Sequence, residues 1–343
     1  MPSKSRKRAL VLSGGGGRGA YHVGVMKFLE EHEWFPDVVA GTSIGAVNGA
    51  AIASGHSARS LRALWQRLRT RDVQKTRLNL SNNFLLDTSP LRQTLQEQGW
   101  VDFDRINSAE AAVHLRVTAT EVSTGHLHVF GNSDDVYPSK MQKEALELDH
   151  IIASCSIPLV YPATQLHETL FWDGATVANT PLGPAIDAGA EEIVVVIMTP
   201  WENDDDTSNN KTPGNLLTAA STMLEWALLA SFQADMKMFR RVNELVQLQI
   251  ENARLRAANA LLQSQIRGEG LEFVDEDGDG IPDILQDKYQ QLPEPIIVAP
   301  KRPIPVEQII TYNEEGHEKL FEMGYQDARR AWREVGRVVE GEG

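Results

Sequence analysis

Short apolar runs alternate with helical patterns over the first two hundred residues. Residues 8–15 read as a strand, apolar at 9–12, that enters a glycine-rich stretch, and residues 20–33 then carry apolar side chains at the spacing of one helix face. Residues 37–41 and 44–54 repeat this strand-then-helix order. Residues 191–198 read as a strand, and residues 193–198 of it form a continuous apolar run, which is typical of a strand buried on both faces. The pattern predicts an α/β fold with a mostly parallel central sheet and helices on both faces.

One part of this region departs from the alternation. Residues 114–122 and 126–130 both read as strands, and only Ser-Thr-Gly separates them. Two strands joined by so short a turn predict an antiparallel hairpin at this point of the sheet.

The pattern changes after residue 200. Helix formers dominate residues 213–267, and Leu248, Leu255 and Leu262 recur every seven residues. Three such positions are too few to define a coiled coil, so we favour a helix that packs on the catalytic body, with a homodimer through 213–267 as the alternative. Residues 213–240 carry many apolar side chains. We favour ordinary packing of these side chains on the sheet, and the alternative is a lid or a membrane-contact face.

These changes define the domain organisation that we expect. It consists of a basic tail (1–7), a catalytic core (8–200), a polar linker loop (201–212), a long helical segment (213–267), an acidic Asp-rich insertion (268–293), and a C-terminal strand and helix that pack back on the core (294–343).

Amino-acid composition limits which partners the protein can bind and where in the cell we expect it. The 343 residues are 42% hydrophobic and carry a formal net charge of −14, which argues against binding to nucleic acid. We interpret the basic residues of the tail as a segment exposed to solvent. The alternative is that they bind weakly to anionic lipid. Cys155 is the single cysteine, so no intrachain disulfide can form. Because no run of about 18 apolar residues occurs, we expect a cytoplasmic protein without a transmembrane helix, with peripheral membrane contact as an option.

The sequence Gly41-Thr42-Ser43-Ile44-Gly45 matches the G-x-S-x-G nucleophile elbow. It lies between a predicted strand and a predicted helix, as that motif requires. Small flanking residues permit a sharp, strained turn that projects the serine at the strand end, next to the positive end of the helix dipole. The alternative is a serine that caps the helix in a turn of small residues.

A second glycine-rich motif follows the first predicted strand. Gly14, Gly16 and Gly19 also satisfy the dinucleotide-binding fingerprint. That fold needs an acidic residue at the end of the second strand, whereas Asp37 precedes the strand and Ser43 follows it. We therefore favour an oxyanion hole, in which unobstructed backbone N–H groups converge on one point.

A nucleophilic serine also needs a base. Asp173 follows an apolar run and precedes Gly-Ala, as expected for a carboxylate at a strand end, although an Asp-Gly turn would look the same. His317 lies late enough to complete a triad, but its surroundings read as the start of a surface helix. His22 follows the glycine loop and is a more distant candidate.

Taken together and in this order, the glycine loop, the serine elbow and the Asp-Gly-Ala motif resemble the patatin-like phospholipases. That family hydrolyses acyl esters of lipids with a Ser–Asp dyad and no catalytic histidine. The resemblance covers about residues 8–200, includes 117–130 and 153–163, and continues more weakly into the C-terminal part.

The resemblance implies a three-layer sandwich with a C-terminal helical extension, and it assigns roles by motif. Ser43 would be the nucleophile, Asp173 the general base, and Gly41 and Gly45 the elbow glycines. The oxyanion loop would comprise Gly15, Gly16, Gly17 and Arg18, of which Arg18 would brace the loop or attract an anionic head group.

The expected function is therefore a serine lipid acyl hydrolase of phospholipase A or lysophospholipase type that needs no cofactor for catalysis. An acyltransferase or thioesterase with the same dyad is the first alternative, and a catalytically silent calcium-dependent scaffold is the second.

The acidic insertion contains the start of an EF-hand-type calcium loop. Carboxylates alternate and a glycine follows at the sixth position, but Gln286 stands where a bidentate Glu is expected. We expect a structural Ca²⁺ site there, with a solvated acidic turn as the alternative. Its ligands would be Asp275, Asp277, Asp279 and Asp283.

Overall fold

The computed structural model describes residues 6–76, 84–134, 141–201, 216–268 and 291–337. The chain divides into two compact units, one formed by residues 1–232 with 295–343 and the other by residues 233–294. The acidic segment 275–287, with its four predicted calcium ligands, lies outside the described residues.

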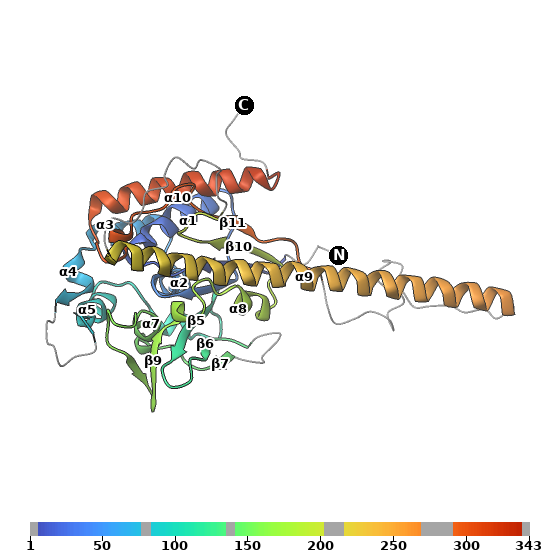
Figure 1. The fold of residues 1–343 in the computed structure, drawn as a ribbon, viewed down its shortest axis with the longest axis horizontal. Helices are drawn as coiled ribbons and strands as arrows, with labels where there is room; N and C mark the ends of the chain where they lie inside the picture. Colours follow the sequence, from blue (N-terminus) through green and yellow to red (C-terminus); the bar gives the residue numbers. More distant parts are fainter. Residues whose placement is uncertain (1–5, 77–83, 135–140, 202–215, 269–290, 338–343) are drawn as a thin grey trace. The chain divides into compact units, whose positions relative to one another are not determined.

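The first unit is built on a central sheet with the strand order β11-β10-β1-β2-β5-β6-β7, to which β9 and β8 are added beside β5 (Figure 1). Neighbouring strands from β11 to β5 are parallel, whereas β5 pairs antiparallel with both β6 and β9. The predicted mostly parallel sheet and the predicted hairpin of β5 and β6 are thus confirmed, and β8 and β9 form a second hairpin that was not predicted. The strands are β1 (Arg8–Leu12), β2 (Val38–Thr42), β5 (His114–Glu121), β6 (Leu127–Gly131), β7 (Met141–Lys143), β8 (Thr164–Leu166), β9 (Thr169–Asp173), β10 (Glu192–Val196) and β11 (Ile296–Val298), with a separate pair β3 (Lys75–Thr76) and β4 (Leu86–Asp87).

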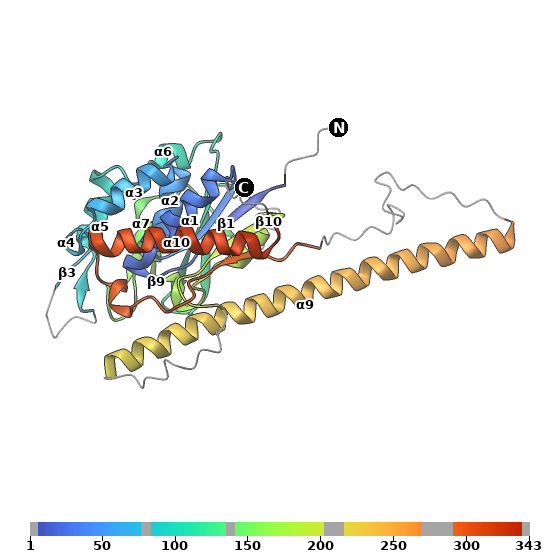
Figure 2. The same cartoon turned by 90° about the horizontal axis from the view of Figure 1, so that it is seen from above.

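Helices lie on both faces of this sheet. Both α2 and α8 pack on β1 and β2, and α10 lies alongside α1 (Figure 2). Every residue of β2 and of β10 is buried, which requires cover on both faces of the sheet. The helices are α1 (Ala20–Glu31), α2 (Ile44–Ala53), α3 (Ala58–Arg67), α4 (Thr70–Val73), α5 (Ser89–Glu97), α6 (Phe103–Ile106), α7 (Leu148–Ser154), α8 (Leu182–Asp187), α9 (Leu216–Arg267) and α10 (Glu314–Glu334), with short 3₁₀ turns η1 (Gly16–Gly19), η2 (Gly174–Thr176) and η5 (Val306–Ile309).

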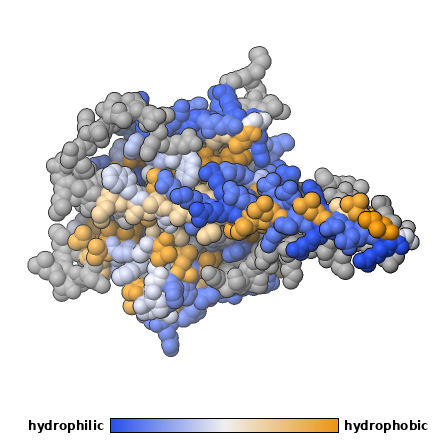
Figure 3. Space-filling model, turned by 45° about the vertical axis from the view of Figure 1, so that its right-hand side comes forward, coloured by the Kyte–Doolittle hydropathy of each residue, from blue (hydrophilic) through white to orange (hydrophobic). Residues whose placement is uncertain are grey.

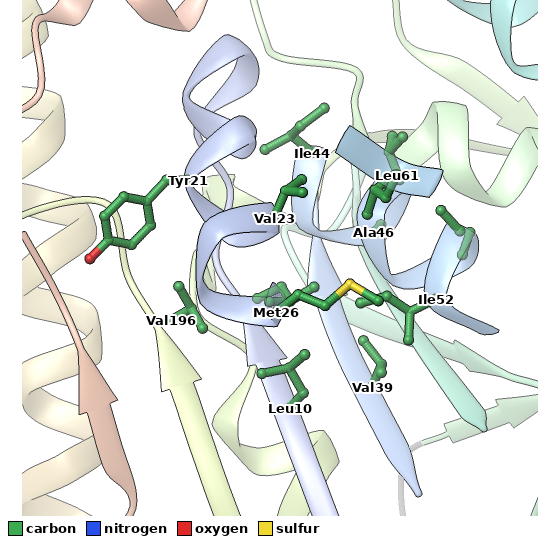
Figure 4. Close-up of a cluster of buried hydrophobic side chains, with 14 of the residues drawn as sticks. Leu10, Tyr21, Val23, Met26, Val39, Ile44, Ala46, Ile52, Leu61 and Val196 are labelled. Carbon is green, nitrogen blue, oxygen red and sulfur yellow. The ribbon is translucent and has the colours of Figure 1, made fainter. Parts of the chain in front are cut away.

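The core lies between the sheet and the helices α1, α2, α3 and α10. Leu10 and Val39 of the sheet meet Val23 and Met26 of α1, while Ile52 closes the cluster from α2 (Figure 4). Every residue of β10 is buried. The continuous apolar run of residues 193–196 predicts this for four of them, and Glu192 is buried with Trp34 and Arg337 as hydrogen-bond donors. Burial of these side chains fixes the strand register and therefore the positions of the loops at the strand ends.

The long helix α9 contributes its first residues to the first unit. There Phe232 is buried and its ring contacts that of Trp201, whereas Met223 and Trp226 are exposed. Among the described residues, no helix is both long enough and apolar enough to cross a membrane.

Candidate active site

Two strand ends meet beside the same strand, β5. Thr42, the last residue of β2, lies opposite Thr118, and Asp173, the last residue of β9, lies opposite Ala119. At Ser43 the chain leaves the sheet to enter α2, and β9 continues along β5 from that point. The register therefore brings the turn at Ser43 next to Asp173, although 130 positions separate them in the sequence.

Ser43 occupies a strained turn. Its backbone has φ 55° and ψ −126°, a conformation that non-glycine residues rarely adopt outside functional sites. Its N–H donates to Oγ of Ser154 at 2.8 Å. The flanking glycines allow the close packing of the turn, because a Cβ on Gly41 would lie 2.3 Å from the carbonyl oxygen of Gly45, and a Cβ on Gly45 would lie 2.2 Å from that of Leu12.

Asp173 is buried at the end of β9, with 2% of its surface exposed. Its Oδ1 accepts from the Ala175 N–H at 2.8 Å, and its own N–H donates to the Ser156 carbonyl at 2.9 Å. Burial raises the pKa of this carboxyl from 3.8 to about 7, although contact with the Ser43 side chain and the Ala175 amide partly oppose this.

The Ser43 side chain lies close enough to this carboxyl to lower its pKa, but Oδ2 of Asp173 makes no hydrogen bond of ordinary length and angle within the described residues. Catalytic hydrogen bonds are often long or poorly aligned before substrate binds.

The glycine loop between β1 and η1 contacts the same turn. β1 and β2 are parallel neighbours, and a Cβ on Gly14 would lie 3.1 Å from Cβ of Ser43. The Gly14 N–H is held by the carbonyl and side-chain oxygens of Asn179, each at 3.1 Å. By contrast, the N–H groups of Gly15 and Gly16 make no hydrogen bond to any described residue, which leaves these donors available to a ligand.

The C-terminal segment 305–312 packs directly on this loop. Gly16 has φ 58°, and a Cβ there would lie 2.0 Å from the Ile309 carbonyl oxygen. Gly17 makes a similarly close approach to Gln308. Arg18 is buried, and its Nε donates to the Pro305 carbonyl at 3.3 Å. Of the two roles considered for Arg18, this contact favours bracing of the loop over recognition of a head group.

A narrow, mainly apolar pocket with a cavity volume of about 20 Å³ lies beside Ser43. Its walls come from α2, the α3–α5 region, the segment after α7, and the C-terminal segment 305–312. They are formed by Gly16, Ser43, Ile44, Val47, Leu68, Val73, Leu91, Thr94, Leu95, Trp100, Cys155, Ile157, Tyr161, Ile309 and Tyr312.

The two histidines considered as bases lie in other environments. His22 is buried against Asn48, and burial lowers its pKa to about 3. His317 is also buried, with Nδ1 at 2.8 Å from the Trp65 carbonyl, and burial lowers its pKa to about 4. A helix with an exposed outer face does begin here, as expected, but His317 lies on its inner face and packs against Trp65.

The sequence did not indicate which residues fix the main chain of the site by hydrogen bonds. Ser154 and Ser156 fix the main chains of Ser43 and Asp173, and Asn179 fixes the glycine loop. The small-residue segment Ala153-Ser154-Cys155-Ser156 was part of the resemblance, but its spacing alone gave no role. No group of three or more metal-type side chains gathers in the described ranges.

Comparison with known proteins identifies the family. A family model described as patatin-like phospholipase matches residues 10–186, more than half of the chain. The chain is 29% identical over 195 residues to patatin-like phospholipase domain-containing protein 6 of Homo sapiens, which covers 55% of this chain and 13% of that protein. It is 26% identical over 254 residues to lysophospholipase NTE1 of Meyerozyma guilliermondii, and the match covers 74% of this chain and 16% of that protein.

A bacterial relative is closer in length. The cGAMP-activated phospholipase of Escherichia coli strain TW11681 is 27% identical over 205 residues, which are 52% of this chain and 54% of that protein. The crystal structure of VipD from Legionella pneumophila superposes with a TM-score of 0.43 and 13% identity over 96% of this chain and 67% of that one. The chain thus spans about half or less of the length of these curated relatives. On the family match, the chain belongs to the patatin-like phospholipases.

Proposed function

We propose that this chain is a serine lipid acyl hydrolase of phospholipase A or lysophospholipase type. The observation that carries the proposal is the meeting of Ser43 on a strained turn, the buried Asp173 carboxylate and the free amides of the glycine loop. The names of the relatives, patatin-like phospholipase and lysophospholipase, support the same class of reaction.

The mechanism follows from these positions. Asp173 takes the proton of the Ser43 hydroxyl as the oxygen attacks the ester carbonyl, and a carboxyl pKa near 7 suits a base at neutral pH. The Gly15 and Gly16 amides stabilise the oxyanion. Asp173 then returns the proton to the leaving alcohol or lysolipid. Water, activated by the same carboxylate, hydrolyses the acyl-serine and releases the fatty acid.

The apolar lining of the pocket, rather than its volume, supports a lipid acyl chain as the group transferred to Ser43. Its walls are almost entirely apolar, and Ser43 lies among the residues that line it. An acyl chain gains about 0.8 kcal/mol for each buried methylene. The polar head group would then remain outside the pocket, on the leaving-group side of the ester.

A membrane or micelle surface would present this substrate. Leu85 and Leu159 are 60% and 76% exposed, and the Leu85 N–H donates to the Leu159 carbonyl. Leu159 lies between Ile157 and Tyr161, which line the pocket, so apolar side chains project close to the pocket walls. Peripheral contact with a lipid surface and a homodimer through segment 213–267 are part of the proposal.

Labelling of the nucleophile and measurement of fatty-acid release test the proposed function. A fluorophosphonate probe should label the wild-type chain and not Ser43→Ala, which would exclude a silent scaffold. The chain should release fatty acid from lysophospholipid, phospholipid or short-chain ester, and Asp173→Asn should abolish release. An added alcohol acceptor that captures most of the acyl group would favour the acyltransferase. Equal labelling of Ser43→Ala would refute the assignment of the nucleophile.

A further inference from the structure

The second compact unit carries an exposed apolar seam along α9. From residue 245 onward, the residues that form this seam are spaced alternately three and four positions apart. This spacing is the a/d pattern of a coiled coil. We call these residues the a/d seam, with Leu245, Asn252, Asn259 and Ile266 at a positions and Leu248, Leu255 and Leu262 at d positions. Its five apolar side chains are 55–84% exposed, and Figure 3 shows apolar groups at intervals along this helix.

The opposite face of the same helix is already covered. Val246, Ala257 and Ser264 are buried, and at 100° per residue they lie about half a turn away from the a/d seam. About one turn before Val246, Asn243 exchanges hydrogen bonds with the main chain of Leu292. The seam is therefore a second apolar face, which the packing of its own unit leaves in solvent.

The shape of the seam indicates a helix as its partner. It occupies two positions in seven, and asparagines interrupt it at 252 and 259. A helix that lies in a lipid surface has a broader apolar face with basic residues at its borders. A narrow a/d stripe with polar a positions is instead the surface that interlocks knobs into holes with another helix.

We propose that the a/d seam binds the a/d seam of a second copy of this chain, as a parallel, in-register two-stranded coiled coil. In a parallel pair each a residue faces its own copy, so Asn252 meets Asn252 and Asn259 meets Asn259, and each pair can exchange an amide hydrogen bond. In an antiparallel pair a positions face d positions, and each asparagine would be left against leucine without a partner. A buried asparagine at an a position is a recognised determinant of register and of the two-stranded state.

The charges beside the seam fit the same arrangement. Glu251 occupies the g position before Asn252, and Arg256 occupies the following e position. In a parallel pair, a g residue lies next to the e residue five positions later on the other helix. Glu251 of one copy would therefore meet Arg256 of the other, twice per dimer.

The mass of the full chain in solution tests the proposal. Light scattering after size exclusion at micromolar concentration should give twice the 38.0 kDa of one chain. Leu255→Lys with Leu262→Lys should halve that mass. Leu261→Lys is the matched control, because Leu261 adjoins Leu262 but lies off the seam, and it should leave the dimer intact. A monomeric wild-type chain, or equal disruption by Leu261→Lys, would overturn the proposal.

Cross-linking and charge reversal test the parallel register. Under mild oxidation, Asn252→Cys should form a covalent dimer, whereas Gln247→Cys, exposed but off the seam, should not. Glu251→Arg should weaken the dimer, and Glu251→Arg combined with Arg256→Glu should restore it. No cross-link through position 252, no rescue by the double reversal, or a wild-type monomer that binds phospholipid vesicles through the seam would each contradict a parallel homodimer.

Discussion

Replacement of Asp173 by asparagine should abolish activity but stabilise the folded chain relative to wild type, and this stabilisation should increase with pH. The folded protein holds this carboxyl at a pKa of about 7 because it is buried, whereas the ordinary value is 3.8. A group with a raised pKa binds a proton more tightly in the folded state, so its contribution to stability is complete below about pH 4 and is lost as the pH rises to about 7. The full difference corresponds to about 4 kcal/mol, since each pKa unit is worth about 1.4 kcal/mol.

Asparagine keeps the shape of the side chain and can still accept from the Ala175 amide, but it never ionises. At pH 8 the wild-type chain carries the buried charge and the variant does not. At pH 5 most folded wild-type molecules are already protonated there. The stability of Asp173→Asn relative to wild type should therefore be greater at pH 8 than at pH 5 by about 3 kcal/mol.

Denaturant unfolding monitored by tryptophan fluorescence at pH 5 and pH 8 measures this difference. Glu110→Gln, which changes an exposed carboxylate, serves as the control and should give nearly the same relative stability at both values. If the relative stability of Asp173→Asn does not change with pH, or is greater at pH 5, Asp173 is not a desolvated carboxylate and the reasoning fails.

Four further predictions concern the pocket, its surroundings and the acidic loop. The kcat/KM of ester hydrolysis should fall below about pH 7, as protonation of Asp173 removes the base, and a rate independent of pH from 5 to 8 would contradict this. Gly16→Ala should abolish turnover, since its Cβ would collide with backbone, whereas Gly125→Ala, at a similar φ but in open space, should not. Leu159→Ser should slow hydrolysis of vesicle lipid and spare a short-chain ester in free solution; equal loss on both would argue against surface contact. Calorimetry should detect Ca²⁺ binding to segment 275–287, and no heat at millimolar calcium would refute that site.

The sequence predicted those parts of the site that depend on local pattern. A strand, a sharp turn and a helix around Ser43 follow from residues 37–54, and the adjacent glycine loop follows from the parallel neighbours β1 and β2. The approach of Asp173 could be predicted only through resemblance, because it depends on β9 pairing with β5 beyond the end of β2. Such pairing between distant segments leaves no periodic signal in the chain.

The contribution of the C-terminal segment was also beyond local reasoning. Segment 305–312 covers the glycine loop and lines the pocket, yet its sequence carries no motif that indicates this contact. The burial of His317 has the same origin, since the inward face of α10 is defined by its neighbours in the fold rather than by polar residues around it.

The most direct test of the central claim is the turnover number of the Asp173→Asn chain for fatty-acid release, measured beside His317→Gln and with folding verified by melting. A lone aspartate base predicts a loss of about 10²–10⁴-fold or more for Asp173→Asn and near wild-type turnover for His317→Gln. Substantial turnover by Asp173→Asn, together with an inactive but folded His317→Gln, would contradict the Ser43–Asp173 dyad.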